Sequence, residues 1–294
     1  MVKRKVNPPV VVKKDCIGCK RCVEICPSFV LEMVEDKAEA VRGDWCIGCG
    51  HCGGVCPPGA IVHEGSRFED HPKKGEEPAA PPGVLELLLR ERRSVRRYVR
   101  TPVPEDVLNR ILTAGAYAPT GTNSQNVHYI VLKSPEQVAE LQKMTLTFYD
   151  KILSRIRGRI GTIILSLFAG RKTVEYLKES LPKVEYGYEQ IKKGKDRLFY
   201  HAPVVILTHA ESWDTSSPFN CAAALYNCSL VAHTLGLGCC FNGILVNAAN
   251  QSPRIKRWLG IPPDHKCYSA MTLGFPDVKY PHLVRRRAPQ VAWR

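Results

Sequence analysis

The stretch DCIGCKRCVEICP at residues 15–27 recurs thirty positions later as WCIGCGHCGGVCP at residues 45–57. Each copy holds four cysteines in the spacing C-x2-C-x2-C-x3-C, and a proline follows the last of them. Gly18 and Gly48 occupy the same place in both copies, where the lack of a side chain lets the backbone curl close to a bound group. Between the copies, residues 30–41 alternate loosely, which predicts a short hairpin.

This cysteine spacing favours iron–sulfur clusters. Three thiolates in one tight turn can hold three irons of a cubane, and the fourth cysteine ligates the other cluster. The spacing therefore predicts two 4Fe-4S clusters with crossed ligands: Cys16, Cys19, Cys22 and Cys56 for one, and Cys46, Cys49, Cys52 and Cys26 for the other. Structural zinc is the alternative, but it usually takes two CxxC pairs separated by a longer loop. This stretch resembles the bacterial two-cluster ferredoxins, which implies a relay for single electrons at low potential.

Charge and cysteines divide the chain of 294 residues into two parts. Residues 1–65 hold nine Lys or Arg and eight Asp or Glu, whereas the remainder carries +13 of the net charge of +14. With 44% hydrophobic residues the chain can bury a sizeable core, which excludes a disordered or fibrous protein. We expect a ferredoxin-like domain over residues 1–65, a proline-rich linker over 66–83 and a second domain over 84–294.

The apolar runs and the cysteines indicate the cellular compartment in which the protein is expected. The longest apolar run, residues 160–170, is too short to span a bilayer, and no secretory signal is visible near Met1. Clustered cysteines in a reducing compartment more often bind metal than form disulfides. We therefore expect a cytoplasmic protein that does not enter a membrane.

The part of the chain after residue 83 mixes helices with strands, so the fold class expected for the whole protein is α+β. Apolar spacing, Ser-Pro starts and buried runs predict these elements: helices over 84–92, 104–117, 134–144, from 217 to a stop at Gly236, and from 252; strands over 127–132, 204–208 and 267–273. An apolar stripe at helical spacing runs from Ile160 to Phe168.

Two arginine clusters and one polar loop suggest a second cofactor. The segment RRSVRR at residues 92–97 and the triplet Arg285–Arg287 can clamp a phosphate. The alternative interpretations of these clusters are solvated surface charge and a patch that binds nucleic acid. The loop APTGTNSQ at residues 118–125 follows a predicted helix and precedes a strand. With a Gly-Leu-Gly turn at 236–238 and LGFP at 273–276, this order resembles the flavin-dependent nitroreductase family over residues 84–290.

The resemblance implies FMN at the interface of an intertwined homodimer. It matches the phosphate-binding positions to Arg92, Arg93, Ser94, Arg96, Arg285 and Arg287, the loop that reaches the flavin from the partner subunit to Pro119, Thr120, Gly121 and Asn123, and the turn beside flavin N5 to Asn242 and Gly243. Residues 146–200 are expected to carry substrate specificity. The catalytic residues stay undetermined, because a flavin supplies the hydride itself.

Together these features predict an iron–sulfur flavoprotein oxidoreductase. Single electrons would pass from the clusters to FMN and then as a pair to a small organic acceptor: a nitro compound, quinone, activated alkene or halogenated ring. An external ferredoxin or another one-electron donor, in an anaerobic host, would feed the clusters. The alternatives are an NAD(P)H-driven flavin reductase, a redox sensor or electron carrier without turnover, and a zinc-containing nucleic-acid binder. With the arginines assigned to phosphate, no nucleic-acid partner is expected.

Overall fold

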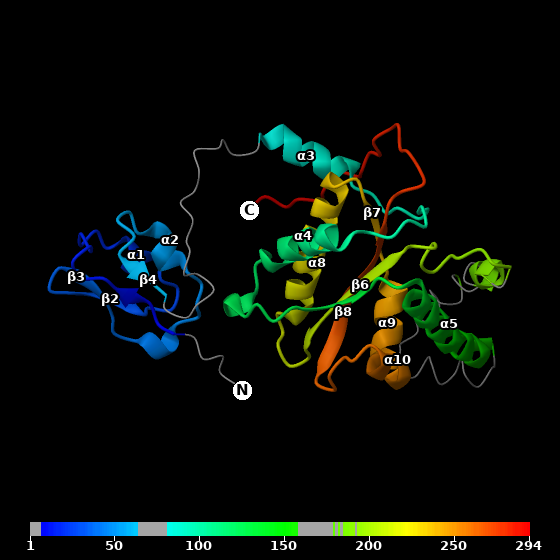
Figure 1. The fold of residues 1–294 in the computed structure, drawn as a ribbon, viewed down its shortest axis with the longest axis horizontal. Helices are drawn as coiled ribbons and strands as arrows, with labels where there is room; N and C mark the ends of the chain where they lie inside the picture. The colour runs from blue at the N-terminus through cyan, green and yellow to red at the C-terminus, as the bar shows by residue number, and fades with distance from the viewer. Residues whose placement is uncertain (1–6, 64–80, 158–178, 180–181, 183–184, 192) are drawn as a thin grey trace. The chain divides into compact units, whose positions relative to one another are not determined.

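A computed structural model describes residues 7–63, 81–157, 179, 182, 185–191 and 193–294 (Figure 1). Most of the predicted linker, the stripe from Ile160 to Phe168 and much of the predicted specificity segment lie outside these residues. The chain divides into two compact units: Met1–Ala79 with Gly121–Ser124, and Ala80–Thr120 with Gln125–Arg294. None of the described helices is long and apolar enough to cross a bilayer.

The first unit repeats one short motif. Helices α1 (Arg21–Ile25) and α2 (His51–Val55) each begin three residues after a left-handed glycine, at Gly18 (φ 70°) and Gly48 (φ 63°). Strands β1 (Val10–Val11) and β4 (Ile61–Val62) pair antiparallel, as do β2 (Leu31–Val34) and β3 (Lys37–Ala40). The β2–β3 pair confirms the hairpin predicted between the two cysteine motifs.

The core of this unit is small. The buried side chains that pack together are Cys22, Val30, Leu31, Ala38, Cys52 and Ile61, and six further cysteines and apolar residues of the repeat lie partly buried against them. Two of these six buried side chains are thus cysteines of the repeat. Few purely hydrocarbon contacts therefore hold the unit together, and groups bound by the thiols would add to its stability.

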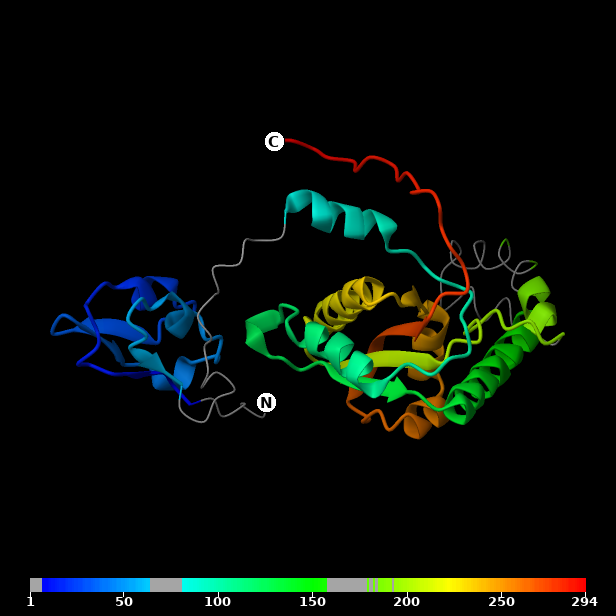
Figure 2. The ribbon, with the colours of Figure 1, turned by 45° about the horizontal axis from the view of Figure 1, so that its top comes forward.

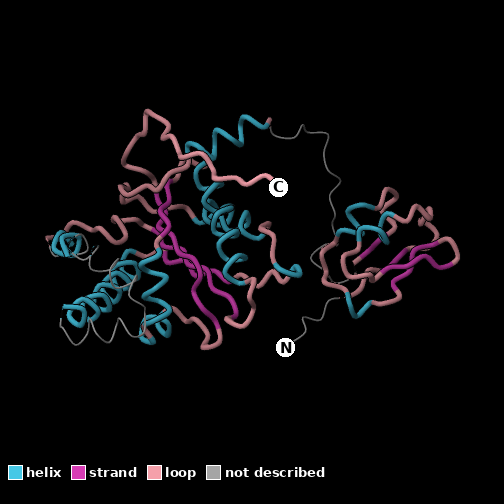
Figure 3. The backbone as a smooth tube through the Cα atoms, turned by 180° about the vertical axis from the view of Figure 1, so that it is seen from behind, coloured by secondary structure: helices cyan, strands magenta, loops and turns pink. Residues whose placement is uncertain are grey.

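The second unit is built on one antiparallel sheet in the order β5-β6-β8-β7. Its strands are β5 (His128–Leu132), β6 (Val204–Glu211), β8 (His265–Gly274) and β7 (Gly238–Phe241). Helices α4 (Glu105–Ala116) and α8 (Ser217–Thr234) cover one face, and α5 (Pro135–Arg157), α9 (Gly243–Gln251) and α10 (Pro253–Trp258) cover the other (Figures 1 and 2). Figure 3 shows the strands between these two groups of helices.

The burial of β6 on both faces of the sheet explains why its sequence does not alternate between apolar and polar residues. Val204 and Ile206 pack into the α4–α8 side of the sheet, whereas Val205 and Leu207 pack into the α5–α9–α10 side. Successive side chains of a strand point to opposite faces, so a strand covered on both faces is apolar at every position. All four residues are at most 1% exposed. The mixed α+β architecture predicted for the chain is confirmed.

Several element boundaries differ from those predicted. Helix α5 continues beyond Met144 to Arg157, and α3 (Pro82–Glu91) begins two residues early. Gly236 ends α8 as expected, because its φ of 77° allows the left-handed turn that stops a helix. Strand β7 and helix α9 follow directly after that turn, and neither was predicted from the sequence. Cys221 and Cys228 on α8 are fully buried, so both thiols belong to the core.

Candidate functional site

The first candidate site is the set of eight cysteines in the first unit. None of them forms a disulfide, and their exposure ranges from buried at Cys22 and Cys52 to exposed at Cys19. Backbone amides donate to the last thiol of each motif: Val30 N to Cys26 Sγ at 3.3 Å and Ala60 N to Cys56 Sγ at 3.2 Å. Because the acceptor and donor are four residues apart in both cases, the sequence repeat is also a structural repeat.

The surroundings of these thiols shift their pKa values in different directions. Burial raises the pKa of the Cys52 thiol to about 12 and also raises the pKa of Cys22 and Cys46. A thiolate at such a position is costly unless a cation stabilises it, and iron does so. At Cys16, hydrogen bonds from the backbone amides of Ala38 and Gly18 lower the pKa instead. The same amides would stabilise the negative charge of a cluster.

The turn at Gly18 leaves no space for a side chain. A Cβ atom there would lie 2.7 Å from the carbonyl oxygen of Asp36, and the φ of 70° disfavours any residue but glycine. One neighbour of the cysteines was not predicted from the sequence: His63 is 1% exposed, and its Nε2 lies 3.3 Å from Cys52 Sγ. No spacing signal marks this histidine, because it lies outside both cysteine motifs.

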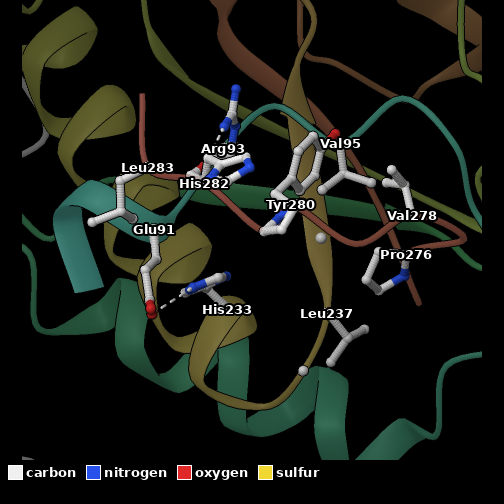
Figure 4. Close-up of a pocket in the computed structure, with 13 residues that line it drawn as sticks. Glu91, Arg93, Val95, His233, Leu237, Pro276, Val278, Tyr280, His282 and Leu283 are labelled. Carbon is white, nitrogen blue, oxygen red and sulfur yellow. Dashed lines mark hydrogen bonds and ion pairs between the residues drawn. The ribbon is translucent and has the colours of Figure 1, made fainter. Parts of the chain in front are cut away.

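The second candidate site lies where the arginine segment meets the C-terminal residues. Arg92, Arg93, Arg285 and Arg286 line a pocket of about 530 Å³ together with Leu89, Arg90, Leu283 and Val284. Arg93 and Leu283 also line an adjoining pocket of about 400 Å³, where Arg93 lies 4.5 Å from the ring centre of Tyr280 (Figure 4). Glu91 and His233 pair across the same pocket at 3.8 Å (Figure 4). Five arginines around one pocket create a field that favours an anion.

The backbone of the arginine segment is fixed by β7. Val95 N donates to the carbonyl oxygen of Cys239 at 2.9 Å, and Ser94 bridges Cys239 in parallel. The Tyr98 hydroxyl donates to the carbonyl oxygen of Val95 at 2.7 Å and lies 2.9 Å from Thr272 Oγ1. Gly238 permits this approach, because a Cβ atom there would lie 2.4 Å from Val95 Cγ2. The segment is therefore held rigidly against the sheet.

One arginine is desolvated without full compensation. Arg92 Nε is buried and has no hydrogen-bond partner among the described residues. Its guanidinium lies 5.8 Å from the ring centre of Tyr226 and beside the thiol of Cys239, whose pKa burial raises to about 11. Buried polar atoms are nearly always paired in proteins, so an orphaned donor at an arginine-lined pocket indicates a missing acceptor.

Several other residues predicted to bind FMN lie outside the pocket lined by Arg92 and Arg285. Ser94 is half-buried and Arg96 and Arg287 are exposed, and none of the three lines the arginine pocket. Pro119, Thr120, Gly121 and Asn123 lie in the loop between α4 and β5, which contains three non-glycine residues with positive φ, at Thr122, Asn123 and Gln125. Pro119 and Thr120, which belong to the same unit as the pocket lined by Arg92 and Arg285, are not among the residues that line it.

Asn242 has a role that its sequence position did not reveal. Its Oδ1 accepts from Leu245 N at 2.9 Å and so caps α9, while its Nδ2 donates to the carbonyl oxygen of Leu198 at 2.8 Å. Both polar groups of the side chain are thus used inside the fold. Gly243 is the first residue of α9, where free backbone amides point out of the helix.

Two family models cover these two units. The model of the nitroreductase family matches residues 89–275, and that of the 4Fe-4S dicluster domain matches residues 15–60. The chain belongs to the nitroreductase family. It is an oxidoreductase of that family that carries a 4Fe-4S dicluster domain before the nitroreductase domain. This confirms both resemblances and the flavin-oxidoreductase class inferred from the sequence.

Individual relatives match the nitroreductase domain. The 4-nitrobenzoate reductase of Nocardioides sp. (strain LMS-CY) is 27% identical over 67% of this chain and 83% of its own length. Iodotyrosine deiodinase 1 of Rattus norvegicus is 23% identical over 69% of this chain and 67% of its own length. A nitroreductase with bound FMN from Desulfitobacterium hafniense has the same fold, with a TM-score of 0.51 and 21% identity over 70% of this chain and 97% of its own.

Proposed function

We propose that this nitroreductase-family protein passes single electrons through two 4Fe-4S clusters to FMN and reduces a small organic acceptor with electron pairs. The observation that carries the proposal is the joining, in one chain, of a dicluster domain with a nitroreductase domain. A flavin that took hydride from a nicotinamide would need no cluster, whereas a one-electron donor needs a path along which its electrons move.

In this proposal all eight cysteines of the repeat are ligands in the crossed pattern. Cys16, Cys19, Cys22 and Cys56 hold one cluster, and Cys46, Cys49, Cys52 and Cys26 hold the other. The amides of Val30 and Ala60 donate to the two crossing thiols and would stabilise the reduced, more negative clusters. His63 beside Cys52 adds one more polar neighbour to the second cluster.

FMN fits the second unit by the chemistry of its donors. Arg92 Nε, which has no hydrogen-bond partner among the described residues, and the pocket formed with Arg93 and Arg285 suit the phosphate, because guanidinium groups bind phosphate through paired hydrogen bonds. Ser94, Arg96 and Arg287 complete the proposed phosphate contacts. Gly243 would offer its backbone amide, whereas the amide of Asn242 donates to the carbonyl oxygen of Ala270 and the side chain of Asn242 is used inside the fold.

The protein is proposed to act as a homodimer. In that assembly Pro119, Thr120, Gly121 and Asn123 would approach the flavin bound by the partner subunit. Apolar side chains that a monomer leaves exposed support this. Val84 and Leu85 on α3 are 59% and 51% exposed, and Trp293 near the C-terminus is 91% exposed. Such surface is typical of contacts between subunits.

The acceptor class follows from the relatives, one named for a nitroaromatic acid and one for an iodinated tyrosine. FMN, when bound, accepts electrons singly and gives them up as a pair. Two electrons and two protons convert a nitro group into a nitroso group and water. Two electrons and one proton convert a carbon–halogen bond into carbon–hydrogen and a halide ion. We therefore propose nitroaromatic and haloaromatic acceptors.

The test is anaerobic purification with quantitation of iron, sulfide and FMN, followed by donor and acceptor assays. We expect about eight irons and one FMN per chain. Reduced ferredoxin is expected to bleach the flavin band, and a nitro- or haloaromatic is expected to restore it. Rapid bleaching by NADH or NADPH would overturn the proposed donor and favour the nicotinamide-driven alternative. Failure of every acceptor to restore the band would favour an electron carrier.

A further inference from the structure

Outside the candidate cofactor sites, four polar side chains meet at one end of the sheet in the second unit. His128 begins β5, His209 and Glu211 lie at the end of β6, and His265 begins β8. The register places His128 opposite His209 and Glu211 opposite His265. A register shift between Thr208 and His209 alters the direction of the side chains that follow it. Side chains from three neighbouring strands therefore lie close together at this end of the sheet.

The distances suit a metal ion. One ligand atom each from His128, Glu211 and His265 lies within 4.8 Å of the other two. Ligand atoms around zinc at about 2.1 Å lie about 3.4 Å apart, so only a small closure is needed. Glu211 is half-buried and His265 is 8% exposed, whereas His128 is exposed and can turn its side chain towards them. The exposed side of His128 also gives an ion access from solvent.

Two of the three side chains are already oriented by neighbours. His209 Nδ1 lies 3.0 Å from His265 Nδ1, which leaves His265 Nε2 for an ion. Glu211 Oε2 accepts from Asn126 Nδ2 at 2.9 Å, which leaves the other carboxylate oxygen. Metal-binding histidines typically use their second nitrogen in such a hydrogen bond, and metal-binding carboxylates are held in the same way.

We propose that His128, Glu211 and His265 bind one divalent ion of the zinc class, with water as the fourth ligand. Two imidazoles and one carboxylate form a donor set that zinc binds well, and three protein ligands leave one position of a tetrahedron open. The ion would join β5, β6 and β8 at the end of the sheet. It would be independent of the iron that the cysteine repeat is proposed to hold.

The test compares two matched substitutions in the full chain, purified anaerobically with its iron and sulfide present. The proteins are dialysed against micromolar Zn²⁺, and bound zinc is then quantified. His128→Asn removes a proposed ligand at an exposed position. His201→Asn makes the same change at another exposed histidine, whose φ of 58° asparagine tolerates. We expect the wild type and His201→Asn to bind one more zinc ion per chain than His128→Asn.

X-ray absorption at the zinc edge identifies the ligands of that ion. We expect nitrogen and oxygen neighbours at about 2.0–2.1 Å, and sulfur at about 2.3 Å would place the zinc on cysteines and overturn the proposal. Equal zinc in the wild type and His128→Asn would also overturn it. The proposal would likewise be overturned if the wild type bound no zinc, because the histidine rings would then pack against one another without holding an ion.

Discussion

Replacing Arg92 by methionine should affect the FMN-bound and FMN-free proteins in opposite directions. Methionine keeps most of the volume and removes the guanidinium, whose Nε is buried without a partner among the described residues. If Nε binds the FMN phosphate, the substitution removes the cost of an unpaired buried donor from the free protein. It also removes a hydrogen bond to the phosphate from the FMN complex. A purely structural arginine would instead stabilise the free protein, so the two explanations differ in sign.

The expected magnitudes follow from the contacts. A hydrogen bond to a charged group contributes about 1.5–3 kcal/mol, so Arg92→Met should weaken FMN binding by about 10- to 150-fold. In the free protein, an unsatisfied buried donor costs about 1–3 kcal/mol. The contact of Arg92 with the half-exposed ring of Tyr226, at 5.8 Å, offsets about 0.5–1 kcal/mol of that. The free variant should therefore be at least as stable as the free wild type.

FMN affinity is measured by the quenching of flavin fluorescence on titration into flavin-free protein, and stability by urea unfolding of the same preparation. Arg97→Met is the matched control, because Arg97 pairs with Asp277 at 2.9 Å with both side chains more than half exposed. This variant should leave FMN affinity unchanged and cost at most about 1 kcal/mol of stability. Unchanged FMN affinity in Arg92→Met, or a clear loss of stability without flavin, would refute the phosphate role.

Three further predictions concern the folds that hold the sites. Gly18→Ala should lower the iron content measured after anaerobic purification, because its Cβ would meet the Asp36 carbonyl oxygen at 2.7 Å; Gly59 has a similar φ and a Cβ there would meet no atom of the described residues within 4 Å, so Gly59→Ala should keep its iron. Tyr98→Phe removes a hydroxyl with two buried hydrogen bonds and should cost about 1–3 kcal/mol in urea unfolding, whereas Tyr117→Phe, 83% exposed, should cost little. Stripping iron and sulfide should abolish hydrogen-exchange protection in residues 7–63 and preserve it in the sheet of the second unit, and protection retained in both would contradict the weak core inferred for the first.

The cysteine repeat could be interpreted from sequence alone because its chemistry is local. Cys16, Cys19 and Cys22 are close in sequence, so any compact turn brings them together, and the position of Gly18 is explained by the same turn. The hairpin between the motifs was also predictable from a short alternating stretch. His63 was not, because its approach to Cys52 depends on how β4 returns to the unit, which no local pattern encodes.

Strand β7 and helix α9 were missed for a related reason. The residues Gly238–Phe241 have no polar alternation and are few, so their strand exists only because β8 offers a partner edge. The family resemblance places Asn242 beside the flavin; the structure shows in addition that its side chain caps α9 and donates to the Leu198 carbonyl oxygen. An asparagine before an apolar stretch is a typical helix cap, and that signal was available in the sequence.

The arginine segment shows the limit of inference from composition. Arg92, Arg93 and Arg97 have the same charge and lie within six residues, so the sequence gives no reason to rank them. In the structure Arg97 is paired with Asp277, Arg93 lies over the ring of Tyr280, and Arg92 alone keeps a buried donor without a partner among the described residues. An ion pair at the surface is satisfied by water and by its own partner. A buried donor is not, so the free energy available for binding an anion is concentrated at Arg92 rather than shared equally by the cluster.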